Sequence, residues 1–140
     1  MSHAEMPIFT RTFDFLSWLL PITNNFPRAH RHTLTKRLLD AAFDLRERLE
    51  EANQRQARRL ERLGEADDAL ARVRVYVRLA ARMGWLTSGQ YEHVAAMTAE
   101  IGRLLGGAAT AQGVHARASA ESRITSRPSS LTIPIADPMR

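Results

Sequence analysis

Residues 34–52 read LTKRLLDAAFDLRERLEEA, and they carry the clearest helical pattern in the chain. Apolar residues recur there at steps of three and four, a spacing that places them on one face of an α-helix. The face consists of Leu34, Leu38, Ala41, Leu45, Leu49 and Ala52. Charged residues fill most of the positions between them, so the stretch predicts an amphipathic helix that buries one side.

Three other stretches show the same spacing, and each predicts a helix with one apolar face. The predicted core residues are Phe9, Phe13, Leu16 and Leu20 in the first helix, Leu63, Ala66, Leu70, Val73, Val77 and Ala80 in the third, and Tyr91, Val94, Met97, Ile101 and Leu104 in the fourth. Sequence signals also mark where the helices begin and end. Pro21 is expected to end or kink the first helix, Phe26-Pro27 opens the second, Gly84 follows the third, Thr87 and Gln90 form a capping box before the fourth, and Gly106-Gly107 ends it.

The boundary between the second and third helices allows two interpretations. A break at Gly64 gives helices of about 36 and 19 residues, whereas a break near Asn53-Gln54 gives about 26 and 28. Antiparallel neighbours of equal length bury more surface against each other. We therefore favour the break near Asn53, which leaves a glycine inside the third helix at a cost of about 1 kcal/mol.

Four helices joined by short connections predict an all-α fold, an antiparallel up-down four-helix bundle. The bundle is expected over residues 9–107, after a loose N-terminal arm at residues 1–8. Residues 108–140 are rich in Ala, Ser, Thr and Pro and show no helical periodicity. That composition predicts a flexible, disordered C-terminal tail.

The composition argues against several classes of function. The chain has no cysteine, which excludes disulfides and thiolate zinc sites and agrees with a reducing cytoplasm. The apolar segment at residues 13–22 is short and contains Pro21, so it predicts neither a membrane span nor a signal peptide. His30 and His32 do not share a helix face, and we expect no metal site there. No nucleotide-binding or hydrolase motif is present, so we expect neither enzyme activity nor a cofactor.

Positive charge is concentrated in two windows that contain no acid. Residues 15–39 and 69–91 lack Asp and Glu, whereas residues 40–68 mix acids with arginines. In an up-down bundle the start of the second helix and the end of the third lie at the same end. The two windows are therefore expected to meet there and form a basic pole. The arginines of this basic pole are Arg28, Arg31, Arg37, Arg74, Arg78 and Arg82.

The basic pole predicts an anionic partner. The three arginines of the third helix recur at every fourth residue, and like charges at this spacing destabilise a helix by about 0.2–0.5 kcal/mol per pair. Free N–H groups where Pro27 opens the second helix would add positive potential beside Arg28 and Arg31. The alternative is that these arginines pair with acids on neighbouring helices or are only solvated. Arg103 is expected to form an ion pair instead, with Glu100 or with an acid of the second helix.

Several segments together resemble the accessory variability determinant (Avd) proteins of diversity-generating retroelements. They are LPITNNFPR at residues 20–28, RLA from Arg78, QYEH at residues 90–93 and AEIGRLLGG at residues 99–107. Their order and spacing across residues 9–107 carry the resemblance. It implies a small basic four-helix bundle that forms a barrel-shaped homopentamer.

The same resemblance implies a function. Avd proteins bind RNA and DNA with little sequence preference and associate with the retroelement reverse transcriptase. Together they support complementary-DNA synthesis from a template repeat, whose mutagenised copy replaces part of a target gene. By position, Arg28, Arg31, Arg74 and Arg78 match basic positions of the family pattern.

Two features leave another function open. Gly107 is followed by Ala108 and a long tail, where Avd sequences continue with Trp and a basic end. Four-helix bundles encoded within ribosomal-RNA intervening sequences share the architecture, and a fold alone does not determine a function. The alternative function is that of a structural helical oligomer or a protein adapter without a nucleic-acid role. The barrel that the resemblance implies should expose apolar residues on a second helical face, and Phe15, Trp18, Tyr76 and Leu79, which lie off the main apolar stripes, fit that expectation.

Overall fold

The computed structural model describes the backbone of residues 6–125 and the side chains of residues 6–111. Within that part every regular element is helical. The four α-helices are α1 (Pro7–Thr23), α2 (Lys36–Gln54), α3 (Arg59–Arg82) and α4 (Ser88–Thr125). A 3-10 turn, η2 (Arg28–His30), and a π-helical turn, η3 (Arg31–Thr35), precede α2, and a second 3-10 turn, η4 (Gln56–Arg58), joins α2 to α3.

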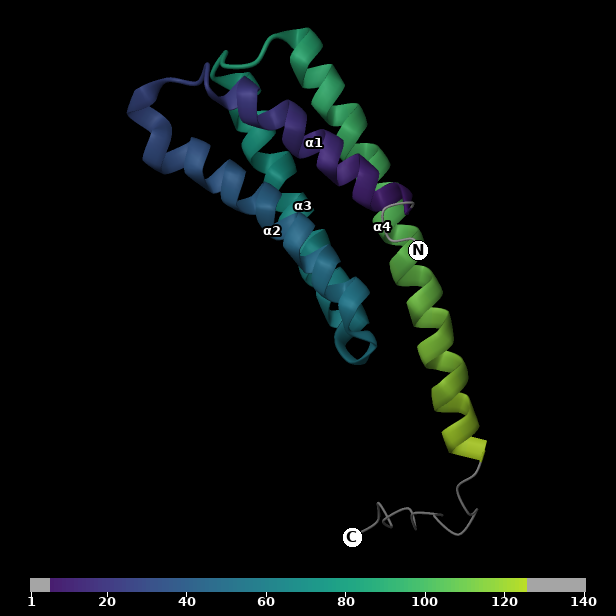
Figure 1. The fold of residues 1–140 in the computed structure, drawn as a ribbon. Coiled ribbons are helices and arrows are strands. Elements are labelled where there is room, and N and C mark those ends of the chain that lie inside the picture. The colour runs from purple at the N-terminus through teal and green to yellow at the C-terminus, as the bar shows by residue number, and fades with distance from the viewer. Residues whose placement is uncertain (1–5, 126–140) are drawn as a thin grey trace, which may run out of the picture.

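The helices form the predicted up-down bundle. Each helix contacts its neighbour in the chain, and α4 closes the arrangement against α1 (Figure 1). The end of α1, the start of the α2 segment, the end of α3 and the start of α4 lie together at one end of the molecule. The α2–α3 turn lies toward the opposite end, where α4 continues past the other helices.

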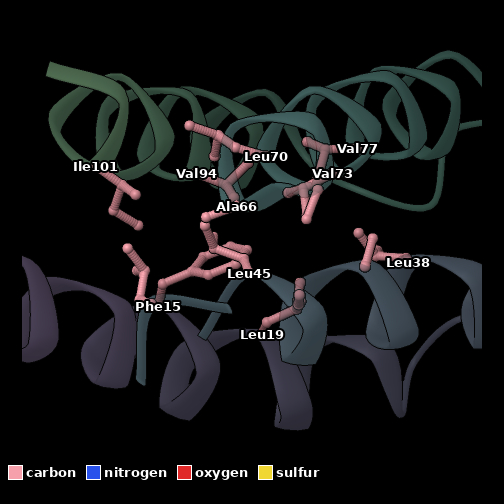
Figure 2. Packing of buried hydrophobic residues seen from close by; sticks show 14 of the residues in the cluster. Phe15, Leu19, Leu38, Leu45, Ala66, Leu70, Val73, Val77, Val94 and Ile101 are labelled. Carbon is pink, nitrogen blue, oxygen red and sulfur yellow. The ribbon is translucent and has the colours of Figure 1, made fainter. Parts of the chain in front are cut away.

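The core residues predicted for the second and third helices are all buried. Leu38, Leu45 and Leu70 are fully enclosed, and Figure 2 shows them in the space between the α1–α2 and α3–α4 layers. The break between α2 and α3 follows Gln54, and Gly64 lies within α3, as the equal-length argument predicts. In α4, Val94 and Ile101 are buried, whereas Tyr91, Met97 and Leu104 are half-buried.

The apolar face predicted for α1 is wrong in part. Phe9 is buried, but Phe13 is 63% exposed and Leu20 is 41% exposed. The buried face instead contains Ile8, Thr12, Phe15, Leu19 and Thr23. This face has the same three- and four-residue spacing. It looks polar in the sequence because it contains two threonines. The Thr12 hydroxyl can be buried because it donates to the Ile8 carbonyl at 2.8 Å.

Arg46 of α2 explains why Phe9 remains buried on the other face of α1. Its Nη1 donates to the Phe9 carbonyl at 2.7 Å and to the Thr12 hydroxyl at 3.2 Å. Its guanidinium also lies over the Phe9 ring, 5.0 Å from the ring centre. A single side chain thus joins the N-terminal half of α1 to α2.

Two predicted helix ends are confirmed by their caps. Gly84 has φ +79° after the end of α3, and the Trp85 N–H donates to the Ala80 carbonyl at 2.9 Å, as in a Schellman turn. At the start of α4, the Thr87 N–H donates to Gln90 Oε1 at 2.9 Å, and the Gln90 N–H donates to Thr87 Oγ1 at 3.0 Å. These reciprocal bonds form the capping box.

Other helix ends differ from the prediction. α1 begins at Pro7 and passes Pro21 to end at Thr23, so proline sits in its last turn. α4 does not end at Gly106-Gly107 but continues to Thr125. Neither glycine has the positive φ of a helix-ending residue, and the alanines that follow favour helix. Residues 1–5 of the expected arm and 126–140 of the expected tail lie outside the described residues.

Candidate functional site

The arrangement of the helices brings the two acid-free windows to one end of the bundle. The first window includes the end of α1 and the start of the α2 segment, and the second includes the end of α3 and the start of α4 (Figure 1). The side chains of the six basic-pole arginines are all exposed. Topology therefore brings the two windows together, as the sequence predicts.

Within residues 6–111, none of the six basic-pole arginines lies within ion-pair distance of a carboxylate. Arg46, Arg48, Arg62 and Arg72, which lie outside the pole, all pair with acids. The densest network joins α2 to α3, where Arg62 lies 3.1 Å from Glu51 and 2.7 Å from Glu65. Hydrogen bonding to Glu65 raises the pKa of Arg62. The basic pole thus carries positive charge that the described part of the bundle does not neutralise.

The six arginines do not converge on one site. Arg28 and Arg31 line a pocket of about 510 Å³ beside the end of α1. Arg37 lines a separate apolar pocket of about 300 Å³ between η2–α2 and α3. Arg74 and Arg78 line a third pocket of about 210 Å³ between α3 and α4. The pole is a surface that extends around the end of the bundle.

Arg74 differs from the other arginines of the pole because it holds two helices together. Its Nη2 donates to the Thr98 carbonyl of α4 at 3.1 Å. A Cβ at Gly102 would meet the same nitrogen, so the guanidinium in its present position crosses α4 over a glycine of the AEIGRLLGG segment. The bond from Arg74 to α4 was not predicted from the sequence.

The helix N-terminus expected at Pro27 lies at Arg31 instead. Residues 28–30 form the short 3-10 turn η2, and His30, with φ −110° and ψ 17°, interrupts the helical backbone. The Thr33 hydroxyl donates to the His30 carbonyl at 3.2 Å. From Arg31 the backbone is helical through the π-helical turn η3 into α2, so the positive end of the helix dipole lies beside Arg31 rather than at Pro27.

Arg103 and Glu100 form the ion pair that the sequence predicts. Arg103 donates from Nη2 to Glu100 Oε1 at 2.7 Å and from Nε to Oε2 at 3.0 Å. Hydrogen bonding to Arg103 lowers the pKa of the Glu100 carboxyl, and the same bond raises the pKa of Arg103. This pair lies on α4, away from the basic pole, and its charges are satisfied.

The histidines and tryptophans make ring contacts at the basic pole. The centre of the Trp85 ring lies 5.6 Å from that of Phe26 and 4.9 Å from that of His30, and the centres of the Trp18 and His93 rings lie 5.2 Å apart.

In the part of the chain with described side chains, no group of three His, Asp or Glu residues could hold a metal ion. No described helix is long and apolar enough to cross a membrane.

The apolar pocket beside Arg37 was not predicted as a site. Its aliphatic lining includes Leu79, which is 45% exposed, and Met83, which is 54% exposed. Leu79 lies off the main apolar stripe of its helix, and Met83 lies four residues further along the chain. This four-residue spacing in the sequence indicates a second apolar face on the helix.

Comparison with known proteins gives a family and a fold. The sequence pattern of the family described as bAvd-like matches residues 6–111. The chain is also similar to a crystal structure of a protein with unknown function from the S23 ribosomal protein family of Bacteroides thetaiotaomicron, with a TM-score of 0.67 and 19% identity. That similarity covers 73% of this chain and 97% of the other, and at this identity it shows the shared fold alone. No curated protein matches the chain.

Proposed function

The chain belongs to the bAvd-like family, and from that membership we propose that it is a non-catalytic accessory subunit of a diversity-generating retroelement. In this proposal it binds the reverse transcriptase and nucleic acid, either template RNA or complementary DNA, and so supports mutagenic DNA synthesis in the cytoplasm. It acts as a homo-oligomer, a pentamer by resemblance to Avd proteins.

The observation that carries the proposal is the unneutralised charge of the basic pole. Phosphate contacts from arginine release counterions and provide affinity without sequence preference. Five of the six arginines, Arg28, Arg31, Arg37, Arg78 and Arg82, make no hydrogen bond or ion pair within the described residues and are free to bind phosphate. Arg74 contributes by fixing α3 against α4. The lack of a single deep site favours contact with a long polyanion.

The alternative function, a structural oligomer or adapter, is favoured by a different observation. Arg46, Arg48 and Arg62 serve the bundle itself through ion pairs with acids of α2 and α3. If the pole arginines only kept the protein soluble, their replacement would leave no nucleic-acid binding to lose. The two functions therefore give opposite results in one binding assay.

The test of nucleic-acid binding uses two matched double variants. Arg28→Gln/Arg31→Gln removes two charges from the basic pole, and Arg55→Gln/Arg58→Gln removes two exposed charges from the opposite end. We expect the pole variant to weaken binding of a random-sequence single-stranded RNA and to reduce the slope of log affinity against log salt by about 0.7 per lost phosphate contact. The control variant is expected to bind almost as the wild type does. Equal losses in both variants would show only a net-charge effect and would refute the pole.

The test of the protein partner is coexpression with a reverse transcriptase encoded beside this gene. We expect the two chains to co-purify at low and at moderate salt, with RNA in the complex. Failure to co-purify, from a chain that forms a stable oligomer and ignores nucleic acid, would favour the structural or adapter function.

A further inference from the structure

The apolar pocket between η2–α2 and α3 has features of a docking site. It measures about 300 Å³ and is lined mainly by apolar atoms. Its lining residues are His30, Thr33, Leu34, Arg37, Tyr76, Leu79, Met83 and Trp85. We refer to it as the α2–α3 pocket.

An exposed apolar strip continues from this pocket along α3. Val75 is 55% exposed, Leu79 45% and Met83 54%, and they recur at every fourth residue. Residues at this spacing share a helix face, and two steps of four residues span about 12 Å. The strip holds three of the seven large apolar side chains that are exposed among the described residues. Contiguous apolar surface of this kind marks interaction sites.

The charge around the α2–α3 pocket has one sign. One side of its lining comes from the acid-free window 15–39 and the other from the acid-free window 69–91, so no carboxylate lines it. Arg37 lines the pocket and makes no ion pair within residues 6–111. A second copy of this chain that docked here through its own basic pole would be repelled. Charge complementarity therefore favours an acidic occupant.

The aromatic residues of the pocket favour a protein segment over a nucleic-acid base. A base needs a free aromatic face on which to stack. The Trp85 ring already contacts the rings of Phe26 and His30, and Tyr76 is half-buried. The most exposed apolar groups are the aliphatic side chains of Leu79 and Met83, which suit an apolar side chain.

We propose that the α2–α3 pocket binds an acidic amphipathic helix of a partner protein. Apolar side chains from successive turns of that helix pack on Leu79 and Met83, and a carboxylate beside them pairs with Arg37. This is helix-in-groove recognition, in which the spacing of apolar anchors gives specificity. The inference rests on the proposed function and deepens it, because it assigns the transcriptase contact to this pocket and leaves nucleic acid to Arg28, Arg31, Arg78 and Arg82.

The test uses a labelled synthetic helix that carries leucines at helical spacing and glutamates elsewhere, with a lysine-for-glutamate version as its counterpart. We expect the full-length protein to bind the acidic helix in fluorescence anisotropy and not the lysine version. Leu79→Ser/Met83→Ser should weaken binding at least tenfold, and Arg37→Gln should weaken it about threefold to tenfold. Leu60→Ser is the matched control, because Leu60 is 47% exposed at the other end of α3. Far-UV circular dichroism checks that each variant is folded. If Leu79→Ser/Met83→Ser is unfolded, the binding of Arg37→Gln still tests the inference.

Several results would overturn the inference. The inference is wrong if the protein does not bind the acidic helix or if it binds the lysine helix equally well. It is also wrong if Leu79→Ser/Met83→Ser and Arg37→Gln both bind the acidic helix as the wild type does, or if oligouridylate displaces the acidic helix from the pocket. A lower oligomeric mass for the double variant without any helix would make the pocket an interface between copies. A wild-type chain that binds the acidic helix but does not co-purify with the transcriptase would instead refute the proposed function and leave the pocket standing.

Discussion

Arg74 and Arg78 lie one turn apart on α3, but only Arg74 is bonded to another helix. Its guanidinium donates to the Thr98 carbonyl, whereas Arg78 makes no such bond within the described residues. We therefore expect Arg74→Ala to lower the free energy of unfolding by about 1 kcal/mol, the net value of one hydrogen bond. Arg78→Ala should change it by less than about 0.5 kcal/mol, as is usual for surface substitutions.

Urea denaturation of both variants measures this difference, and each serves as the control for the other. If Arg78→Ala destabilises the protein as much as Arg74→Ala does, the Thr98 bond has no special role. A loss of nucleic-acid binding in Arg74→Ala has to be corrected for stability before it is assigned to a phosphate contact. Arg78→Ala needs no such correction, which makes it the better probe of the pole.

Glu100 provides a pH-dependent prediction. The hydrogen bonds from Arg103 lower the pKa of its carboxyl in the folded protein. A lowered folded-state pKa contributes stability above the unfolded-state pKa and loses it as the pH falls through the folded value. We expect Glu100→Gln to have a lower Tm than the wild type at about pH 7, and this difference to shrink as the pH falls through the folded-state pKa and the carboxyl becomes protonated. If the Tm difference stayed the same as the pH fell, the ion pair would not be lowering the pKa of Glu100 in the folded protein relative to the unfolded protein.

At the scale of the element, α4 is longer than the bundle that it joins. Its last fully buried side chain among the described residues is Leu105, and Ala108 is partly buried against the core. We expect a variant that ends at Ala111 to keep its unfolding free energy within about 1 kcal/mol of the full chain, because it keeps every buried apolar side chain of residues 6–111. Its helical circular dichroism per molecule should fall, since α4 runs on to Thr125.

Guanidinium denaturation and far-UV circular dichroism of the shortened variant check this prediction. A variant ending at Arg103 is the counterpart, because it also removes Leu105 from the core. We expect that variant to be destabilised by about 2–5 kcal/mol, as for loss of a buried leucine side chain. If both shortened variants were equally unstable, residues beyond Ala111 would have to support the bundle.

The elements that the sequence predicts well are those with one long apolar stripe. The stripes of α2 and α3 are confirmed because each continues over six positions at helical spacing, whereas the second apolar set of α3 consists of Val75, Leu79 and Met83 alone. α1 has two such sets, and the buried one contains Thr12, whose hydroxyl bonds to its own helix. The turns η2 and η3 were missed because proline signals a helix start but does not report that His30 leaves helical geometry. The glycine signal at the end of α4 failed because a glycine ends a helix only when it adopts positive φ.

At the scale of the molecule, the sequence predicts where the basic pole lies but not how it is divided. Alternating helix directions are enough to bring the two acid-free windows to one end. The pocket that each arginine lines depends on the rotation of its helix and on the neighbouring side chains. Neither can be predicted from the spacing of residues in the sequence alone. Arg74 illustrates this, because its guanidinium bonds to Thr98 and crosses α4 over Gly102, residues that are far along the chain. The pocket beside Arg37 likewise exists only when η2, α2 and α3 are packed together.

The subunit interface is a further property of the whole molecule. Of the residues predicted to face other subunits, Phe15 is fully buried in the core, Trp18 and Tyr76 are half-buried, and Leu79 is exposed. Phe13 and Phe43 are 63% and 40% exposed, on α1 and α2. They lie one turn along from the contact between Phe9 and Arg46, so antiparallel packing brings both to the surface where α1 and α2 meet, which we call the α1–α2 face.

We predict that the α1–α2 face forms the homo-oligomer interface. In this arrangement, Phe13→Ser/Phe43→Ser should reduce the mass in light scattering from a multiple of the 15.8 kDa chain toward the single chain. Neither ring is fully buried in the core, so the bundle should stay folded. Burial of the exposed parts of the two rings, about half of each, contributes about 1.5–3 kcal/mol that the variant loses. Leu60→Ser removes a comparably exposed apolar side chain elsewhere and should leave the mass unchanged. An oligomer that survives the double substitution, or one that Leu60→Ser also dissociates, would place the interface on another face. A chain whose assembly depends on Phe13 and Phe43 would keep its basic pole and α2–α3 pocket open to other partners, because those surfaces lie at the end of the bundle and on α3.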